Sequence, residues 1–171
     1  MEIREQSEHV IVAKVENKPG VVSRISGFFT RRGYNLESFT TSTTETPEIY
    51  HLTFKVKCLP DDAQLLIHQL GRIQEVIEVY DTAGISTVTR EIMFIKIKCP
   101  QEKNIEIVQV CQMLDIKILS RGESSNGVSA NGTITVEIVG NAQKLDEIKK
   151  QLEVYGIVQI IRSGPITIDN N

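Results

Sequence analysis

The order strand, helix, strand, strand, helix, strand is expected twice along this chain of 171 residues. In each half the apolar residues alternate with a period of two where a strand is expected. The period becomes 3.6 where a helix is expected. A second occurrence of the same order within one chain indicates an internal repeat of a whole supersecondary unit.

The first half carries the clearer pattern, and turn-forming residues separate its elements. We expect its elements, in chain order, at residues 9–16, 19–33, 35–44, 49–58, 60–73 and 76–82. A strand, a helix, a hairpin, a helix and a last strand make the split βαββαβ arrangement of ferredoxin-like sandwiches. Residues 83–89, AGISTVT, are small or polar and uncharged, and are expected to form a linker.

The second half repeats the order, with elements expected at residues 90–99, 102–114, 116–123, 133–140, 141–156 and 157–162. The polar, glycine-containing residues 124–132 are expected to form a loop. We therefore predict an α+β protein of two tandem ferredoxin-like βαββαβ sandwiches. The predicted domains are residues 1–84 and 85–171.

Each expected helix has an apolar face that should pack on a sheet. The residues expected on these faces are Val21, Val22, Ile25, Phe28 and Phe29, then Leu65, Leu66, Leu70 and Ile73, then Ile105, Val108 and Cys111, and last Leu145, Ile148 and Leu152. Arg24, Arg31 and Arg32 fall largely on another face of the first helix. They are expected to be a solvated surface or to meet an acidic partner.

Charge and cysteine content argue against several classes of function. The net charge is −3 and the pI is about 5.7, which argues against wide contact with nucleic acid because that needs a basic face. The three cysteines show no CxxC or Cys/His pairing, so neither a disulfide framework nor a zinc site is expected. No apolar run reaches the ~20 residues that span a bilayer, and no signal peptide is recognised. We expect a soluble protein in a reducing compartment.

The junction between the first strand and the first helix, at residues 17–20, has features that favour binding of an anion. Pro19 suits a first helical position, and Gly20 lets a ligand approach the backbone closely. The amides of Gly20 and Val21 would then point at a guest, with the positive end of the helix dipole behind them. The sequence therefore predicts that this turn binds a small carboxylate.

The run NKPGVVSRISGFFTRRGYNLES, at residues 17–38, resembles the N-terminal ACT domain of the small, regulatory subunit of acetolactate synthase, also called acetohydroxyacid synthase. The resemblance includes the Asn-x-x-Gly turn, the Ser-Arg pair on the helix and the exit Arg-Arg-Gly-Tyr-Asn-x-Glu-Ser. The segments TTETPEIYHLTFKV, QLGRIQEVIEVYD and TREIMFIKIKC also resemble that family. The resemblance to the family covers residues 1–100 well and residues 101–171 more loosely.

The resemblance implies a non-catalytic regulatory subunit. In that family the small subunit activates a separate large subunit and confers feedback inhibition by branched-chain amino acids, usually valine. Thiamine diphosphate, a divalent metal (Mg) and flavin (FAD) belong to the large subunit, so no cofactor is expected in this chain. The family is dimeric through its ACT domains. A bacterial cytoplasm is the expected compartment, with a plastid as the alternative.

The resemblance also implies an effector site shared by two protomers. Carried over by motif, Asn17, Gly20 and Val21 would line one side, and Asn35 with Leu36 of the other protomer the opposite side. Ser23 is a further candidate behind them. The Asn side chains can donate and accept, which suits a zwitterionic amino acid, and Leu36 and Val21 could form an apolar slot. Each of these polar residues could equally be ordinary turn or cap chemistry.

Two segments depart from the family pattern. Tyr50-His51 stands where the family commonly has Ser-Arg, and Ile161-Arg162-Ser163-Gly164 stands for Ala-Arg-Thr-Gly. The second segment could end a strand or bind a partner. These departures motivate the alternative of a stand-alone amino-acid-binding ACT protein that does not pair with acetolactate synthase.

The remaining functional hypotheses are an enzyme and a transcription regulator. No Ser/His/Asp, Cys/His or paired-carboxylate set with suitable spacing occurs, so no catalytic residue is expected. The three histidines, His9, His51 and His68, share no spacing that indicates a metal site. No helix-turn-helix segment or basic stripe supports DNA binding.

Overall fold

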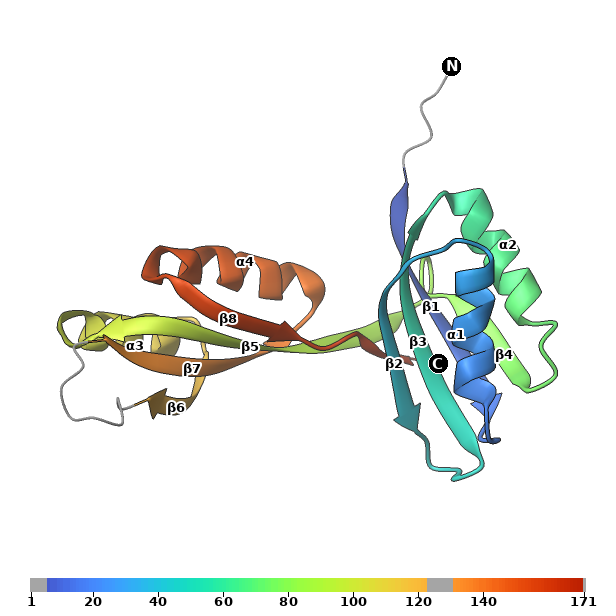
Figure 1. The fold of residues 1–171 in the computed structure, drawn as a ribbon, viewed down its shortest axis with the longest axis horizontal. Coiled ribbons are helices and arrows are strands. Elements are labelled where there is room, and N and C mark those ends of the chain that lie inside the picture. The colour runs from blue at the N-terminus through green and yellow to red at the C-terminus, as the bar shows by residue number, and fades with distance from the viewer. Residues whose placement is uncertain (1–5, 123–130, 171) are drawn as a thin grey trace, which may run out of the picture. The chain divides into compact units, whose positions relative to one another are not determined.

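The computed structural model describes residues 6–122 and 131–170. Its chain divides into two compact units, one of residues 1–89 and 164–171 and the other of residues 90–163. Most of the loop expected at 124–132 lies outside the described residues. Each unit has two helices and four antiparallel strands in the order βαββαβ, and a further strand, β9 (Ile166–Asp169), pairs with β5 (Thr87–Pro100). This confirms the predicted α+β fold of tandem ferredoxin-like sandwiches (Figure 1).

The first unit has the elements β1 (Ser7–Glu16), α1 (Val21–Arg31), β2 (Leu36–Thr43), β3 (Ile49–Cys58), α2 (Pro60–Leu70) and β4 (Val76–Asp81). Its sheet has the order β2-β3-β1-β4, so β2 and β4 are edge strands. Both helices cover the same face of this sheet (Figure 1). Pro60 begins α2 as predicted, because proline at a first helical position gives up only an N–H that has no partner there.

The helix α1 begins two residues later than predicted. Gly20, at φ 85° and ψ −4°, is in the left-handed region and cannot be part of a right-handed helix. Pro19 therefore belongs to the turn, and Val21 is the first helical residue. This places the turn residues 17–20 in front of the helix.

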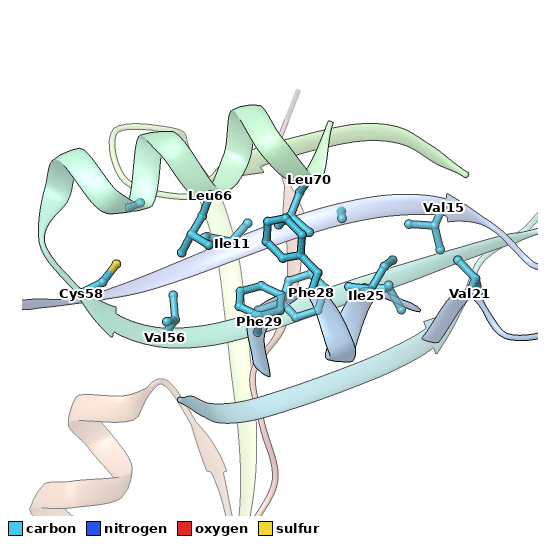
Figure 2. Packing of buried hydrophobic residues seen from close by; sticks show 14 residues of the cluster. Ile11, Val15, Val21, Ile25, Phe28, Phe29, Val56, Cys58, Leu66 and Leu70 are labelled. Carbon is cyan, nitrogen blue, oxygen red and sulfur yellow. The ribbon is translucent and has the colours of Figure 1, made fainter. Parts of the chain in front are cut away.

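The core of the first unit lies between the helices and the sheet. Figure 2 shows Ile25, Phe28 and Phe29 of α1 in one buried cluster with Leu66 and Leu70 of α2. The ring centroids of Phe29 and Phe54 lie 5.0 Å apart, as do those of Phe39 and Phe54. The face predicted for α1 is confirmed except that Val22 is only partly buried.

The second unit repeats the topology. Its elements are β5 (Thr87–Pro100), of which the first three residues belong to the first unit, a 3₁₀ turn η1 (Gln101–Lys103), α3 (Asn104–Met113), β6 (Lys117–Gly122), β7 (Asn131–Gly140), α4 (Ala142–Leu152), η2 (Glu153–Tyr155) and β8 (Ile157–Arg162). The order β6-β7-β5-β8 is that of the first sheet. Leu145, Ile148 and Leu152 are buried as predicted.

The predicted burial of two helix residues is wrong. Leu65 is 49% exposed and Ile105 is 75% exposed, whereas Leu66 and Ile107 are buried in their helices. Both helices are short and have several apolar residues in a row, so periodicity alone did not determine which side faces the sheet.

The last strand, β9 (Ile166–Asp169), was not expected from the sequence. It pairs with the start of β5, where the Oγ1 atoms of Thr89 and Thr167 lie 2.9 Å apart and the Asn170 amide donates to the Ser86 carbonyl. Residues 164–171 therefore group with the first unit, whereas the predicted boundary at residue 84 gave them to the second.

The C-terminal segment crosses the face of the first sheet that the helices leave open. A Cβ at Gly164 would lie 2.3 Å from Thr40 Oγ1, so a larger residue would require the Thr40 and Ser38 side chains of β2 to move. Further along, Ile166–Asp169 line a cavity of about 380 Å³ together with Lys14, His51 and residues 42–45. The tail thus covers part of the face that a ferredoxin-like sandwich exposes.

Candidate functional site

The turn between β1 and α1 is held by backbone hydrogen bonds on both sides. The amide of Asn17 donates to the Glu48 carbonyl at 2.7 Å, and the amide of Glu16 donates to the Glu75 carbonyl at 2.8 Å. The Asn17 side chain is also fixed, because its Nδ2 donates to the Pro47 carbonyl at 3.1 Å. Its Oδ1 is then the atom that can accept from a guest.

Gly20 shapes the mouth of the turn. Its left-handed conformation is one that residues with a Cβ rarely adopt, and nothing lies within 4 Å of where that Cβ would be. The space in front of α1 is therefore open. Glycine is needed here for the backbone conformation and not because a neighbour would clash.

The open donors differ in part from those predicted. The Val21 amide donates to the Lys18 carbonyl at 3.1 Å, and the Val21 side chain is buried in the core. Neither is available to a guest within this chain. Among the described residues, the amides of Gly20, Val22 and Ser23 have no acceptor, and no side chain caps the helix. The reason is that the helix begins two residues later than expected, which moves the orphan donors along the helix.

The second half of the predicted site lies at the exit of α1. The helix ends through Gly33 at φ 72°, and the Tyr34 amide donates back to the Phe29 carbonyl at 3.1 Å. Asn35 follows and is exposed, and Leu36 begins β2 and packs partly against the core. This is the left-handed cap expected from the glycine.

The structure brings Asn17 together with Gly20, and Asn35 together with Leu36, but it does not bring the two pairs together. An α-helix of 11 residues, about 16 Å long, separates them. One chain therefore does not form the whole predicted site. The edge strand β2 runs from the second pair, and its outer edge has no partner strand among the described residues.

Sequence comparisons give the family of the chain. Residues 11–78 match the family described as AHAS small subunit-like ACT domain, and residues 90–171 match the family described as Small subunit of acetolactate synthase. A probable acetolactate synthase small subunit from Methanothermobacter thermautotrophicus is 35% identical over 162 residues, which cover 94% of this chain and 92% of that protein. The chain belongs to the acetolactate synthase small-subunit family.

Other members of the small-subunit family agree with this result. The acetolactate synthase small subunit of Mycolicibacterium smegmatis is 28% identical over 94% of this chain and 89% of its own length. The crystal structure of the acetolactate synthase small subunit from Thermotoga maritima matches with a TM-score of 0.78 and 28% identity, over 96% of this chain and 98% of that one. The first unit is therefore an ACT domain.

The two segments that depart from the family pattern lie in different units. His51 lines the cavity under β9, and burial, followed by the nearby Lys14 ammonium, lowers its pKa below the ordinary value. Arg162 is internal to the second unit: its Nε donates to the buried Glu91 carboxylate and its Nη1 donates to Asp146 Oδ1 at 2.7 Å. Its guanidinium is thus engaged within its own unit rather than directed to a partner.

Other chemistry is sparse in the described residues. Within 6–122 and 131–170, no group of three or more His, Cys, Asp or Glu side chains could hold a metal ion. Cys58, Cys99 and Cys111 are buried, and burial raises the pKa of each thiol, which keeps it in the unreactive protonated form. No helix of that part of the chain is both long and apolar enough to cross a membrane.

Proposed function

We propose that this chain is the regulatory subunit of an acetolactate synthase, which activates a separate catalytic subunit and makes it sensitive to valine. Membership of the small-subunit family supports a regulatory role and not a catalytic one. The observation that carries the sensing role is the open helix start behind Gly20, with the unpartnered amides of Val22 and Ser23. Branched-chain amino acid biosynthesis is the process in which it would act.

The helix start suits the carboxylate of an amino acid. The two amides and the positive end of the α1 dipole would stabilise the negative charge. The ammonium group needs an acceptor, and the Asn17 Oδ1 is in place for this role because Nδ2 already donates to Pro47. Asn35 would supply a second amide group, and Leu36 would contact an apolar side chain.

A second copy of the chain would complete the site. Because Asn17 and Gly20 lie at one end of α1 and Asn35 and Leu36 at the other, both pairs can contact one ligand only if the second pair comes from another protomer. Antiparallel pairing of the edge strand β2 with its copy would form a homodimer through the ACT domains. A ligand between protomers favours one arrangement of them, and a coupling of ~1–3 kcal/mol would be enough for regulation.

The reaction itself would belong to the catalytic subunit. Thiamine diphosphate, Mg and FAD are assigned to that subunit, and this chain is proposed to hold none of them. The bacterial cytoplasm is the proposed compartment.

Reconstitution tests the function. The purified catalytic subunit is assayed for acetolactate formation with increasing amounts of this chain, with and without valine, leucine or isoleucine. We expect stimulation that saturates and is reversed by valine. A chain that binds valine but neither binds nor stimulates the catalytic subunit would instead be a stand-alone amino-acid sensor. A thermal shift with each amino acid identifies which ones bind the native state.

Mixed dimers test the sharing of the site. One chain carries Gly20→Asp and the other carries Asn35→Ala, so that both damaged halves meet in one of the two sites. We expect about one intact valine site per dimer by calorimetry. Two intact sites, or none, would contradict a site built from both protomers.

A further inference from the structure

A groove between α1 and the end of α2 is lined by arginines. Its volume is about 520 Å³, and four guanidinium groups surround it, those of Arg24, Arg31, Arg32 and Arg72. Phe28, Gln69, Ile73 and Gln74 make up the rest of the lining. We call it the arginine groove. It lies within the ACT domain, and none of the proposed effector residues lines it.

Two of the arginines are held in place by the domain itself. An Arg24 Nη atom donates to the buried Glu75 carboxylate. Arg32 Nε donates to Gln69 Oε1 at 2.5 Å, and its guanidinium carbon lies 3.9 Å from the centroid of the Phe28 ring. Such contacts reduce the side-chain entropy that would be lost when a partner binds.

The other two arginines are left for an outside partner. Arg31 and Arg72 are exposed, and neither makes a side-chain hydrogen bond or ion pair with any residue that the structure describes. The chain as a whole carries a net charge of −3, so this local cluster of positive charge is opposite in sign to the net charge. Like charges held close together repel, and an acidic partner would relieve that repulsion.

An apolar notch continues the groove. It has a volume of about 190 Å³ and is lined by Arg32, Tyr34, Leu65, Leu66 and Gln69, so it shares two residues with the arginine groove. Leu65 is 49% exposed although it is a leucine on a packed helix. Arginine, tyrosine and an exposed apolar side chain around one depression are typical of the centre of a protein–protein interface.

The spacing favours a protein segment over a small anion. Arg24 and Arg31 are two turns apart on α1, about 10 Å along its axis. A single phosphate or carboxylate is too small to contact both arginines. It also has no apolar group that could enter the notch. A peptide segment with several carboxylates and one apolar side chain would use both the groove and the notch.

We infer that the arginine groove and the notch together dock an acidic segment of the catalytic subunit. This inference rests on the proposed function, since it names the surface through which this chain contacts its partner. Carboxylates of that segment bind Arg31 and Arg72, and an apolar side chain enters the notch beside Leu65. Regulation would pass from the effector turn to this surface through α1, which borders both.

Charge reversal tests the docking surface. The double variant Arg31→Glu with Arg72→Glu is compared with Arg121→Glu, an exposed position on β6 of the second unit with the same chemical change. The activity of the catalytic subunit is titrated with each chain at low and high NaCl. We expect the half-saturating concentration of the double variant to rise by about tenfold or more and to depend less on salt, with the control near wild type. Valine binding by calorimetry should be unchanged.

The outcomes separate the two proposals. If wild type stimulates the catalytic subunit and the double variant does so equally well, the docking inference is overturned and the proposed function stands. An equal loss in the Arg121→Glu control would also overturn it, since net charge and not the groove would be responsible. A wild-type chain that does not bind the catalytic subunit overturns both proposals.

Two further measurements complete the test. Leu65→Ala should weaken docking without changing the urea midpoint, because the side chain is half exposed; an unchanged docking affinity would remove the notch from the surface. Calorimetry with pyrophosphate examines the small-anion alternative. Pyrophosphate binding that is lost in the double variant, with docking unaffected, would assign the groove to a small anion and overturn the inference.

Discussion

Substitutions at Gly20 separate the contribution of the turn to folding from its contribution to ligand binding. The residue has φ 85°, and no atom lies within 4 Å of an added Cβ. Gly20→Ala should therefore destabilise the protein through backbone strain alone, by about 1–2 kcal/mol. For a protein of this size, 1 kcal/mol corresponds to a fall in Tm of about 2–4 °C. Asparagine adopts this conformation more readily, so Gly20→Asn should cost less.

Gly20→Asp adds a charge to nearly the same shape. Two unit charges about 4 Å apart repel by about 1 kcal/mol in water and by about 4 kcal/mol at an effective dielectric constant near 20. If a ligand carboxylate sits before the amides of Val22 and Ser23, Gly20→Asp should weaken valine binding at least about tenfold relative to Gly20→Asn.

Calorimetry with valine and urea unfolding measure the two effects on the same samples. The Asn variant serves as the control for shape and backbone strain. Equal valine affinities of the Asp and Asn variants would refute the placement of the carboxylate. A loss of more than about 3 kcal/mol in Gly20→Ala would refute the open space in front of the turn.

Three other predictions concern stability. Phe29→Ala removes a ring that is 1% exposed and packed against two others, and should lower the free energy of unfolding by about 3–5 kcal/mol, as measured by urea denaturation. Arg162→Ala leaves the buried Glu91 carboxylate without its cation and should cost about 3–5 kcal/mol in the same assay; a change below 1 kcal/mol would contradict the pairing. Burial, with Lys14 nearby, lowers the pKa of His51, so the native state resists a proton that the unfolded state accepts near pH 6.5. Stability should therefore be lost as pH falls from 7 through 6.5 toward 5, and His51→Gln should flatten that dependence whereas the exposed His68→Gln should not.

The order of the elements followed from local features of the sequence. Alternating apolar residues in 49–58, helical spacing in 21–29 and punctuation by Pro60 and Gly33 depend on residues within a few positions of each other. These patterns predicted both sandwiches and the helix start at the turn. The faces of α2 and α3 were partly missed because runs of apolar residues fit more than one helical side.

The turn illustrates the limit of such local reasoning. The presence of Pro19 and Gly20 indicated a helix start with free donors, but the sequence did not reveal that the Val21 amide would be used by Lys18. A shift of two residues in the helix start changed which amides are open. That shift depends on the left-handed conformation of Gly20. The start of the turn is tied to the rest of the domain because the Asn17 amide donates to the Glu48 carbonyl.

The sequence by itself determined the two sandwiches and the order of their elements, because both depend on neighbouring residues. Only the tertiary structure decided which unit takes the last strand and where the arginines gather. The contact of β9 with β5 joins Thr89 to Thr167, 78 positions apart, and the arginine groove joins Arg31 of α1 to Arg72 after α2. No period of two or 3.6 residues carries information over such separations, so these features appear only when helices and strands pack.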